Sequence, residues 1–205
     1  MKLYTFATAP NPRRVHVYLA EKGIDVPFEH VDIMKRQNRT PEFIAEKNRM
    51  GGLPVLELDD GTHIAESLAI CRYFEAENPT PPLFGDSSFE QAQVEMWIRR
   101  IELNFMMPVG MVWIHGSPLT KGVVEKQIEE VAEQNRAVVN RYFGFLDRHL
   151  AENEYLAGDA FSMADIVGLC TMEFAANLNG LSHPPERANL DRWFRQVCSR
   201  PSAKA

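Results

Sequence analysis

The chain has 205 residues, of which 45% are hydrophobic and 24% charged, and its formal net charge is −6. These values describe an ordinary folded protein whose core is large enough to need no metal or disulfide. The charges are mixed along the chain, with no run of five or more of one sign, which argues against a nucleic-acid or membrane-surface partner. Small molecules and proteins are the expected partners.

The cysteines and histidines are scattered. Cys71, Cys170 and Cys198 are odd in number and far apart, which favours a reducing compartment and buried free thiols. None of the six histidines has metal-ligand spacing to a cysteine or another histidine, so no metal site is predicted. No apolar segment approaches the roughly 20 residues of a membrane helix, and the first apolar run is too short for a signal peptide. We therefore expect a cytoplasmic protein.

The first 80 residues alternate between short strand-like and short helical runs. Strands are expected at 2–6, 28–33, 53–58 and 62–66, and helices at 12–23, 40–48 and 67–78. The helix between the first two strands implies a parallel pair, and the Asp60-Gly61 turn implies that the last two strands are antiparallel. This order is typical of a thioredoxin-like α/β domain.

Helix-capping and turn-forming residues mark where these elements begin and end. Gly23 is a predicted C-terminal cap, and Thr40-Pro41 reads as an N-cap followed by the first helical residue. Beyond a stretch rich in Pro, Gly and Ser, four helical segments are expected at 89–115, 121–150, 163–179 and 189–199. Ser162 and Asp165 are spaced as a capping box, a structural role. The predicted division is a thioredoxin-like domain at 1–80, a linker at 81–88 and an all-helical domain at 89–205.

The segment "GGLPVLELDDGTHIAES" carries the first functional hypothesis. Pro54 stands at the head of a central-looking strand, where it cannot donate to the ladder, so it requires an edge, a bulge or a cis bond. With a cis Leu53–Pro54 bond, the N–H and C=O of Leu53 would face outward and pair with a short extended peptide. The plainer alternative is that Pro54 only ends a loop.

Glu66 and Ser67 lie where the last strand gives way to a helix. A helix N-terminus at Ser67 favours a carboxylate, and the side chain of Glu66 suits an ammonium group. The pair therefore describes a receptor for a zwitterionic α-amino acid head. The structural alternative is that Ser67 is an N-cap and Glu66 its dipole partner.

Together with "TPEFIAEKN", "AFSMADI" and the all-helical second half, this segment resembles the cytosolic glutathione transferases over nearly the whole chain. The resemblance implies a thioredoxin-like domain followed by an all-α domain, a homodimer, and glutathione as cosubstrate with no further cofactor and no metal. It implies glutathione contacts at the following residues: Asn11, Asn38, Leu53, Pro54, Glu66 and Ser67.

In this family the residue that activates the thiol lies in the loop after the first strand, here "TAPNPRRV". Phe6 cannot serve as a tyrosine, residues 8–12 contain no cysteine, and Pro10 stands where a serine is used. The loop most resembles the bacterial nu-like or theta-like branch, which implies catalytic roles for Asn11 and Thr8. Arg13 and its neighbour Arg14 would add positive potential, or are solvated charges on a first helical turn.

The apolar, methionine-rich stretch "NFMMPVGMVWIHG" suits adaptable recognition of varied electrophiles. The expected substrate pocket contains Phe6, Met106, Met107, Met111 and Trp113. The function expected from the resemblance is conjugation of glutathione to small hydrophobic electrophiles in detoxification. Two alternatives are a nu-like glutathione-dependent disulfide-bond reductase and a non-catalytic glutathione-binding or adaptor protein.

Overall fold

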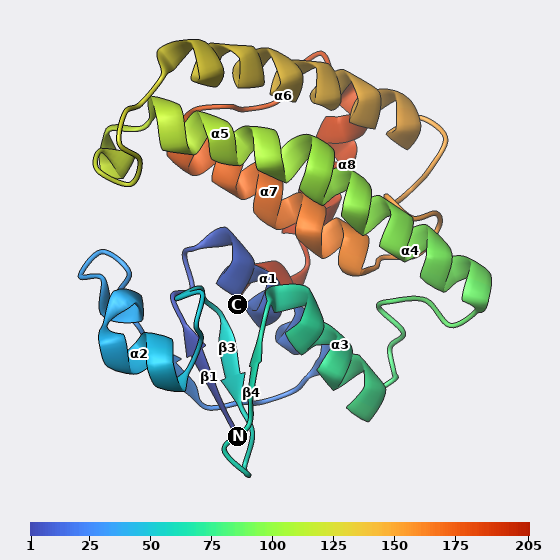
Figure 1. Cartoon of the computed structure of the whole chain (residues 1–205). Helices are drawn as coiled ribbons and strands as arrows, with labels where there is room; N and C mark the ends of the chain where they lie inside the picture. Colours follow the sequence, from blue (N-terminus) through green and yellow to red (C-terminus); the bar gives the residue numbers. More distant parts are fainter. The chain divides into compact units, whose positions relative to one another are not determined.

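The computed structural model describes residues 1–205, and the chain forms two compact units (Figure 1). The first unit contains residues 1–82 and 201–205, and the second contains residues 83–200. The chain therefore passes from one unit to the other inside the proline-rich stretch at 78–88. Residues 201–205 belong to the first unit, whereas the sequence analysis assigns everything after residue 88 to the helical domain.

The first unit is built on a four-stranded sheet in the order β2-β1-β3-β4. Its strands are β1 (Lys2–Thr5), β2 (Phe28–His30), β3 (Val55–Glu57) and β4 (His63–Ala65). β1 is parallel to β2 and antiparallel to β3, and β3 is antiparallel to β4, so the predicted strand directions are confirmed. Each strand is shorter than the sequence pattern indicates.

Three helices and two 3₁₀ turns complete this unit, and their bounds are α1 (Pro10–Lys22), η1 (Gln37–Arg39), α2 (Pro41–Glu46), α3 (Ser67–Glu77) and η4 (Pro201–Lys204). Helices α1 and α3 pack against each other, and Figure 1 shows α2 on the other side of the sheet. The arrangement is the predicted thioredoxin-like one.

The predicted caps of α1 and α2 are confirmed. Gly23 ends α1 with φ 64°, and Thr40 Oγ1 accepts a hydrogen bond from the Phe43 N–H at 3.2 Å. The start of α1 differs, because the helix begins at Pro10 rather than at Pro12. Proline is tolerated throughout a first helical turn, where its missing N–H has no intrahelical acceptor, so the sequence alone does not choose between the two prolines.

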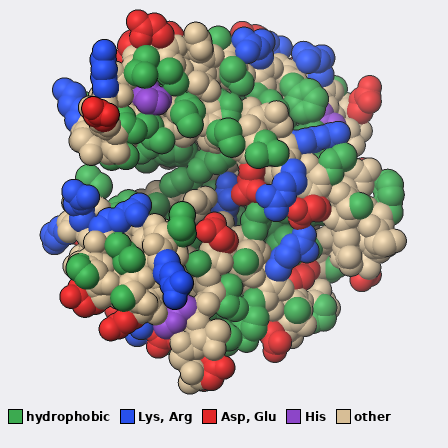
Figure 2. All heavy atoms as spheres, viewed as in Figure 1, with side chains coloured by type: hydrophobic (Ala, Val, Ile, Leu, Met, Phe, Trp, Pro, Cys, Tyr) green, Lys and Arg blue, Asp and Glu red, His purple; other side chains and the backbone are tan.

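The second unit is entirely helical, as predicted, apart from its connections. Its elements are α4 (Ser88–Ile101), the π-helical turn η2 (Glu102–Met106), α5 (Met107–Gly116), the 3₁₀ turn η3 (Pro118–Thr120), α6 (Glu129–Leu150), α7 (Met163–Asn179) and α8 (Ala188–Cys198). None of them is long and apolar enough to cross a bilayer. Figure 2 shows acidic and basic side chains interspersed over one face of the molecule, in keeping with the mixed charge of the sequence.

The predicted helix 121–150 is wrong over its first eight residues, because α6 begins at Glu129. Gly122 has φ 87°, outside the helical region, and the side-chain amide of Gln127 donates to the carbonyls of Ile114 (3.0 Å) and Ser117 (2.8 Å). These bonds fold residues 121–128 back onto the end of α5. The helical pattern in this stretch is therefore overridden by tertiary contacts.

Pro108 lies inside the predicted helix 89–115 and does not break it. The Met107 N–H bonds to the carbonyl of Glu102, five residues earlier, so a π-helical turn stands between α4 and α5. Such a wide turn shifts the hydrogen-bond register of the helix. Pro108 consequently falls in the first turn of α5, where it needs no N–H.

The capping box at Ser162 and Asp165 is confirmed. The carboxylate of Asp165 accepts from the N–H of Ser162 (3.0 Å), the N–H of Leu156 (3.0 Å) and Nε1 of Trp193 (2.8 Å). Burial raises the pKa of Asp165 to about 6, and these donors oppose the rise. Asp165 is thus a structural residue that ties the start of α7 to the loop before it and to α8.

Polar groups on the sheet face that carries α2 converge on one carboxylate. Glu57 Oε2 accepts from the Tyr4 hydroxyl (2.6 Å), the Lys47 ammonium (2.9 Å) and His63 Nε2 (3.1 Å). These hydrogen bonds, the one from Tyr4 first, lower the pKa of Glu57 to about 2. Glu57 therefore joins β1, α2 and β4.

The shifted pKa of Glu57 predicts a pH dependence of stability. Its folded-state pKa lies below the ordinary value of 4.5, so its stabilising contribution is present above about pH 4.5 and is lost as the pH falls towards 2. Glu57→Gln should lower the thermal midpoint most near neutral pH, and the difference from wild type should shrink towards pH 2. Circular dichroism melts measure this, with Glu29→Gln, outside the cluster, as the control. A difference that persists unchanged at pH 2 would contradict it.

Candidate functional site

The strand register brings three loops to one edge of the sheet. Tyr4 of β1 pairs with Val55 of β3, and Val55 pairs with Ala65 of β4, so these three residues form one row across the sheet. β1 ends beside this row, β3 begins there and β4 ends there. The loop after β1, the residues before β3 and the residues after β4 therefore lie at the same edge, the site edge.

Leu53 and Pro54 form the central part of the site edge. The Leu53–Pro54 peptide bond is cis, as predicted, and Pro54 is buried. The backbone N–H and C=O of Leu53 take part in none of the chain's hydrogen bonds, and Leu53 lies outside the β3 ladder. This residue therefore offers one donor and one acceptor to an extended ligand.

Glu66 and Ser67 form the second part. Ser67 is the buried first residue of α3, and the exposed Glu66 stands at the N-cap position without capping the helix through its side chain. The N–H groups of Ser67 and Leu68 consequently have no partner in the chain. Glu66 has φ 71°, a left-handed conformation that is costly for a residue with a side chain and that clusters at functional sites. The sequence predicts the pair at the junction of strand and helix, whereas it gives no sign of the unusual backbone of Glu66.

The start of α1 forms the third part of the site edge, and its first turn has few free hydrogen-bond donors. The N-cap residue Ala9 has no capping side chain, and its N–H bonds to the Phe6 carbonyl at 2.9 Å. Pro10 and Pro12 have no N–H. Asn11 is exposed, and neither its backbone N–H nor its side-chain amide has a partner in the chain. The first turn thus presents both donors of a single residue, at the positive end of the helix.

The other predicted glutathione-site residues, Thr8 and Asn38, differ in their exposure to solvent. Thr8 is exposed in the loop that leads to α1. Asn38 is buried, and its side-chain amide donates to the Gly51 carbonyl at 2.6 Å, which supports the loop before Leu53. A direct contact of Asn38 with glutathione stays a prediction.

The two arginines after Pro12 are not solvated charges. Arg14 is 2% exposed, so that alternative is wrong for it. Arg13 Nη2 donates to the Ala203 carbonyl at 2.6 Å, and Nη1 donates to a main-chain oxygen of Ala205. The guanidinium of Arg13 is therefore engaged with the segment that follows α8, a long-range contact that no local pattern signals.

The predicted substrate-pocket residues belong to both units. Phe6, in the first unit, is half-buried with its ring 5.3 Å from that of His30. In the second unit, Met107 is 53% exposed, Met106 and Met111 are half-buried, and the ring of the half-buried Trp113 lies 5.8 Å from that of Phe174. Their common role in a pocket stays a prediction.

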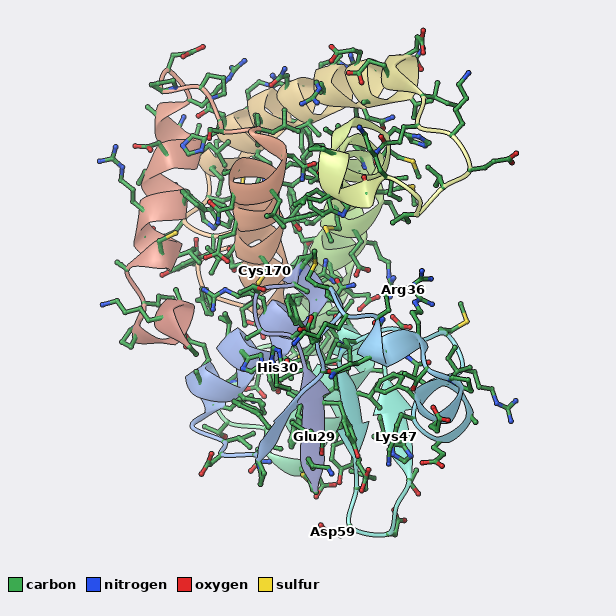
Figure 3. The ribbon with its side chains drawn as sticks, turned by 90° about the vertical axis from the view of Figure 1, so that its left-hand side faces the viewer. Glu29, His30, Arg36, Lys47, Asp59 and Cys170 are labelled. Atoms are coloured by element: carbon green, nitrogen blue, oxygen red, sulfur yellow. The ribbon has the colours of Figure 1, made fainter.

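A cavity of about 400 Å³ lies between α2 and the strands β1 and β2. Figure 3 labels Glu29, His30 and Lys47, which line it together with Tyr4 and others. None of the residues predicted to contact glutathione or substrate lines it, whereas Tyr4 and Lys47, which bind Glu57, do. The sequence gives no sign of this cavity, because it depends on how a short helix covers a polar sheet face.

Comparison with known proteins agrees with the fold. The chain matches the family model of the glutathione S-transferase N-terminal domain over residues 3–82 and that of the C-terminal domain over residues 104–201. Glutathione S-transferase 2 of Saccharomyces cerevisiae is 38% identical over 100% of this chain and 88% of its own length.

Two solved structures are similarly close. The crystal structure of Gtt2 from Saccharomyces cerevisiae superposes with a TM-score of 0.92 at 38% identity, covering 100% of this chain and 99% of that one. A class Gtt2 glutathione S-transferase of Vibrio parahaemolyticus superposes with a TM-score of 0.87 at 33% identity. The match covers 100% of this chain and 96% of that one. The chain belongs to the glutathione S-transferase family, and it is a glutathione transferase.

Proposed function

We propose that glutathione lies extended along the site edge, with its γ-glutamyl group at Glu66 and Ser67, its central backbone at Leu53 and its sulfur at Asn11. The observation that carries this proposal is that all three segments leave hydrogen-bond groups unused at one edge of a sheet. Three unpaired sets of backbone and side-chain groups in a row at one sheet edge fit an extended, polar ligand that would supply their partners.

The γ-glutamyl end is a zwitterion, and the start of α3 matches both of its charges. Its carboxylate fits the N–H groups of Ser67 and Leu68, where the helix dipole is positive. Its ammonium fits the carboxylate of Glu66, the adjacent exposed residue. The left-handed backbone of Glu66 turns the chain directly from β4 into this helix.

Glu66→Ala is expected to weaken glutathione binding by about 1.5–3 kcal/mol, the usual range for a hydrogen bond to a charged group. Alanine adopts the left-handed conformation no more readily than glutamate, so the backbone penalty stays similar. Isothermal titration calorimetry measures the dissociation constant. Glu77→Ala, at the other end of α3, is the matched control and should leave it unchanged. Equal affinity of wild type and Glu66→Ala would remove Glu66 from the site.

Activation of the sulfur requires stabilisation of its anion. A thiol with an ordinary pKa of about 8.5 is mostly protonated at neutral pH, whereas the thiolate is the nucleophile. The two donors of Asn11 and the positive end of α1 all favour the thiolate, and none of them has to accept the proton. The thiolate then attacks an electrophilic carbon and displaces a leaving group or opens a strained ring.

Asn11→Ala is expected to raise the pKa of the bound glutathione thiol and to lower kcat/KM by about 10- to 1000-fold, the upper end being what an oxyanion-hole donor contributes. Asn11→Asp, of the same shape but without the donor and with a negative charge, should raise that pKa further. Thr8→Ala should change the thiol pKa and kcat/KM by less than Asn11→Ala does. The measurement is thiolate absorbance of the complex against pH. An unchanged titration in both Asn11 variants would show that another group holds the sulfur.

The electrophile is proposed to contact Met106, Met107, Met111 and Trp113 of the second unit, whose apolar and adaptable side chains suit varied small substrates. Phe6 is the candidate contact in the first unit. A second candidate activity is reduction of disulfides, as in the nu-like branch that the first loop resembles. It is favoured by the unpartnered Asn11 amide and by the absence of cysteine in residues 8–12, which leaves the glutathione sulfur as the attacking group.

A panel of an aryl halide, an epoxide and a mixed disulfide with glutathione separates these activities. Conjugation predicts turnover of the first two, and disulfide reduction predicts turnover of the third. Retention on glutathione-agarose without any turnover would instead support a non-catalytic adaptor and contradict both enzymatic proposals.

By its family we further infer that the protein acts as a cytoplasmic homodimer in detoxification. Two chains of 23.4 kDa would then sediment together. Sedimentation at the monomer mass would contradict the dimer.

A further inference from the structure

The segment of residues 201–205, here called the strap, lies along α1. Ser202 is buried, and its hydroxyl donates to the Glu21 carboxylate near the end of that helix. Arg13, in the first turn, donates to the carbonyl of Ala203 and to a main-chain oxygen of Ala205. These contact points on α1 are eight residues apart, about 12 Å along the helix axis. The strap therefore holds α1 near both of its ends.

The first turn of α1 needs such a support. Ala9 provides no side-chain cap, and the prolines at positions 10 and 12 remove two backbone donors. The bond from the Arg13 N–H to the Ala9 carbonyl (3.0 Å) is the first backbone bond of the helix. First turns are where helices fray, and hydrogen bonds from a guanidinium are stronger than those between neutral groups. The contact at Arg13 thus anchors this turn to the strap and leaves the Asn11 N–H unpaired.

We propose that Arg13 is a positioning residue for the thiol site, acting through the strap rather than through its charge on the sulfur. Arg13 follows Asn11 by two residues in the same turn, so a shift of its backbone moves both donors of Asn11. The proposal rests on the proposed role of Asn11. It also assigns a role in catalysis to the buried hydroxyl of Ser202, the second point at which the strap meets α1.

Three variants separate position from charge. Arg13→Lys keeps the charge and loses the planar fork that reaches two carbonyls. Ser202→Ala removes the second contact without any change of charge. Lys204→Gln is the matched control, because it removes a charge from an exposed residue of the strap and breaks none of the contacts described.

For Arg13→Lys we expect the pKa of the bound thiol to rise by about one unit and kcat to fall about 10-fold, within what a displacement of 1 Å can cost. KM for glutathione should change little, because the γ-glutamyl site is on α3. Ser202→Ala should shift the same two quantities in the same direction by less, and Lys204→Gln should match wild type. If Arg13→Lys and Ser202→Ala both retain the wild-type thiol pKa and kcat, the proposal is wrong.

The double variant Asn11→Ala/Arg13→Lys distinguishes this proposal from the role of Asn11 itself. Positioning through Asn11 predicts that the effect of Arg13→Lys largely disappears in the Asn11→Ala background. Fully additive effects would overturn the positioning proposal and leave the role of Asn11 standing. An unchanged thiol pKa in Asn11→Ala alone, with a changed one in Arg13→Lys, would overturn the role of Asn11 instead.

Discussion

The antiparallel pairing of β3 with both of its neighbours is the constraint on which the site depends. Because β3 runs against β1 and β4, its first residue lies beside the last residues of the other two strands. Three segments far apart in sequence, around Asn11, Leu53 and Glu66, are thereby brought to one edge. A parallel arrangement of β3 with β1 would place Leu53 at the opposite edge, away from the start of α1.

The two helices that begin at this edge, α1 and α3, both lack a side-chain cap at their first turn. α2, which begins elsewhere in the same unit, has its first turn capped by Thr40, whereas α1 and α3 begin at Ala9 and Glu66 without a side-chain cap. An uncapped start lowers helix stability but leaves N–H groups available to an anion. The unit compensates for this at α1 with the strap, and at α3 by burying Ser67.

Much of the fold of the first unit, and the position of the site edge, could be predicted because they depend on the local conformational preferences of a few residues. Gly23 and Thr40 mark helix ends by their own conformational preferences, and Pro54 excludes an ordinary ladder position wherever it falls. The Asp60-Gly61 turn sets the direction of β4, and only Gly61 of the pair has the positive φ that such a turn uses. The site edge follows from these few residues.

The remainder depends on contacts that the sequence does not display. The non-helical residues 121–128 are set by the hydrogen bonds from Gln127 to the end of α5, and the π-helical turn before Pro108 is set by the bond from Met107 to Glu102. The bond from Arg13 to Ala203 joins residues 190 positions apart. The sequence alone therefore suggests that Arg13 and Arg14 either raise the potential at the sulfur or are solvated. In the structure Arg14 is buried, and Arg13 binds the strap.

The most direct test of the central claim is an amide NMR titration of the protein with glutathione, at pH values on both sides of the thiol titration. The account predicts that the backbone signals of Asn11, Leu53 and Ser67 shift together on binding, and that the two amide signals of Asn11 shift again as the thiol loses its proton. Shifts confined to the cavity under α2, with these three residues unmoved, would contradict it.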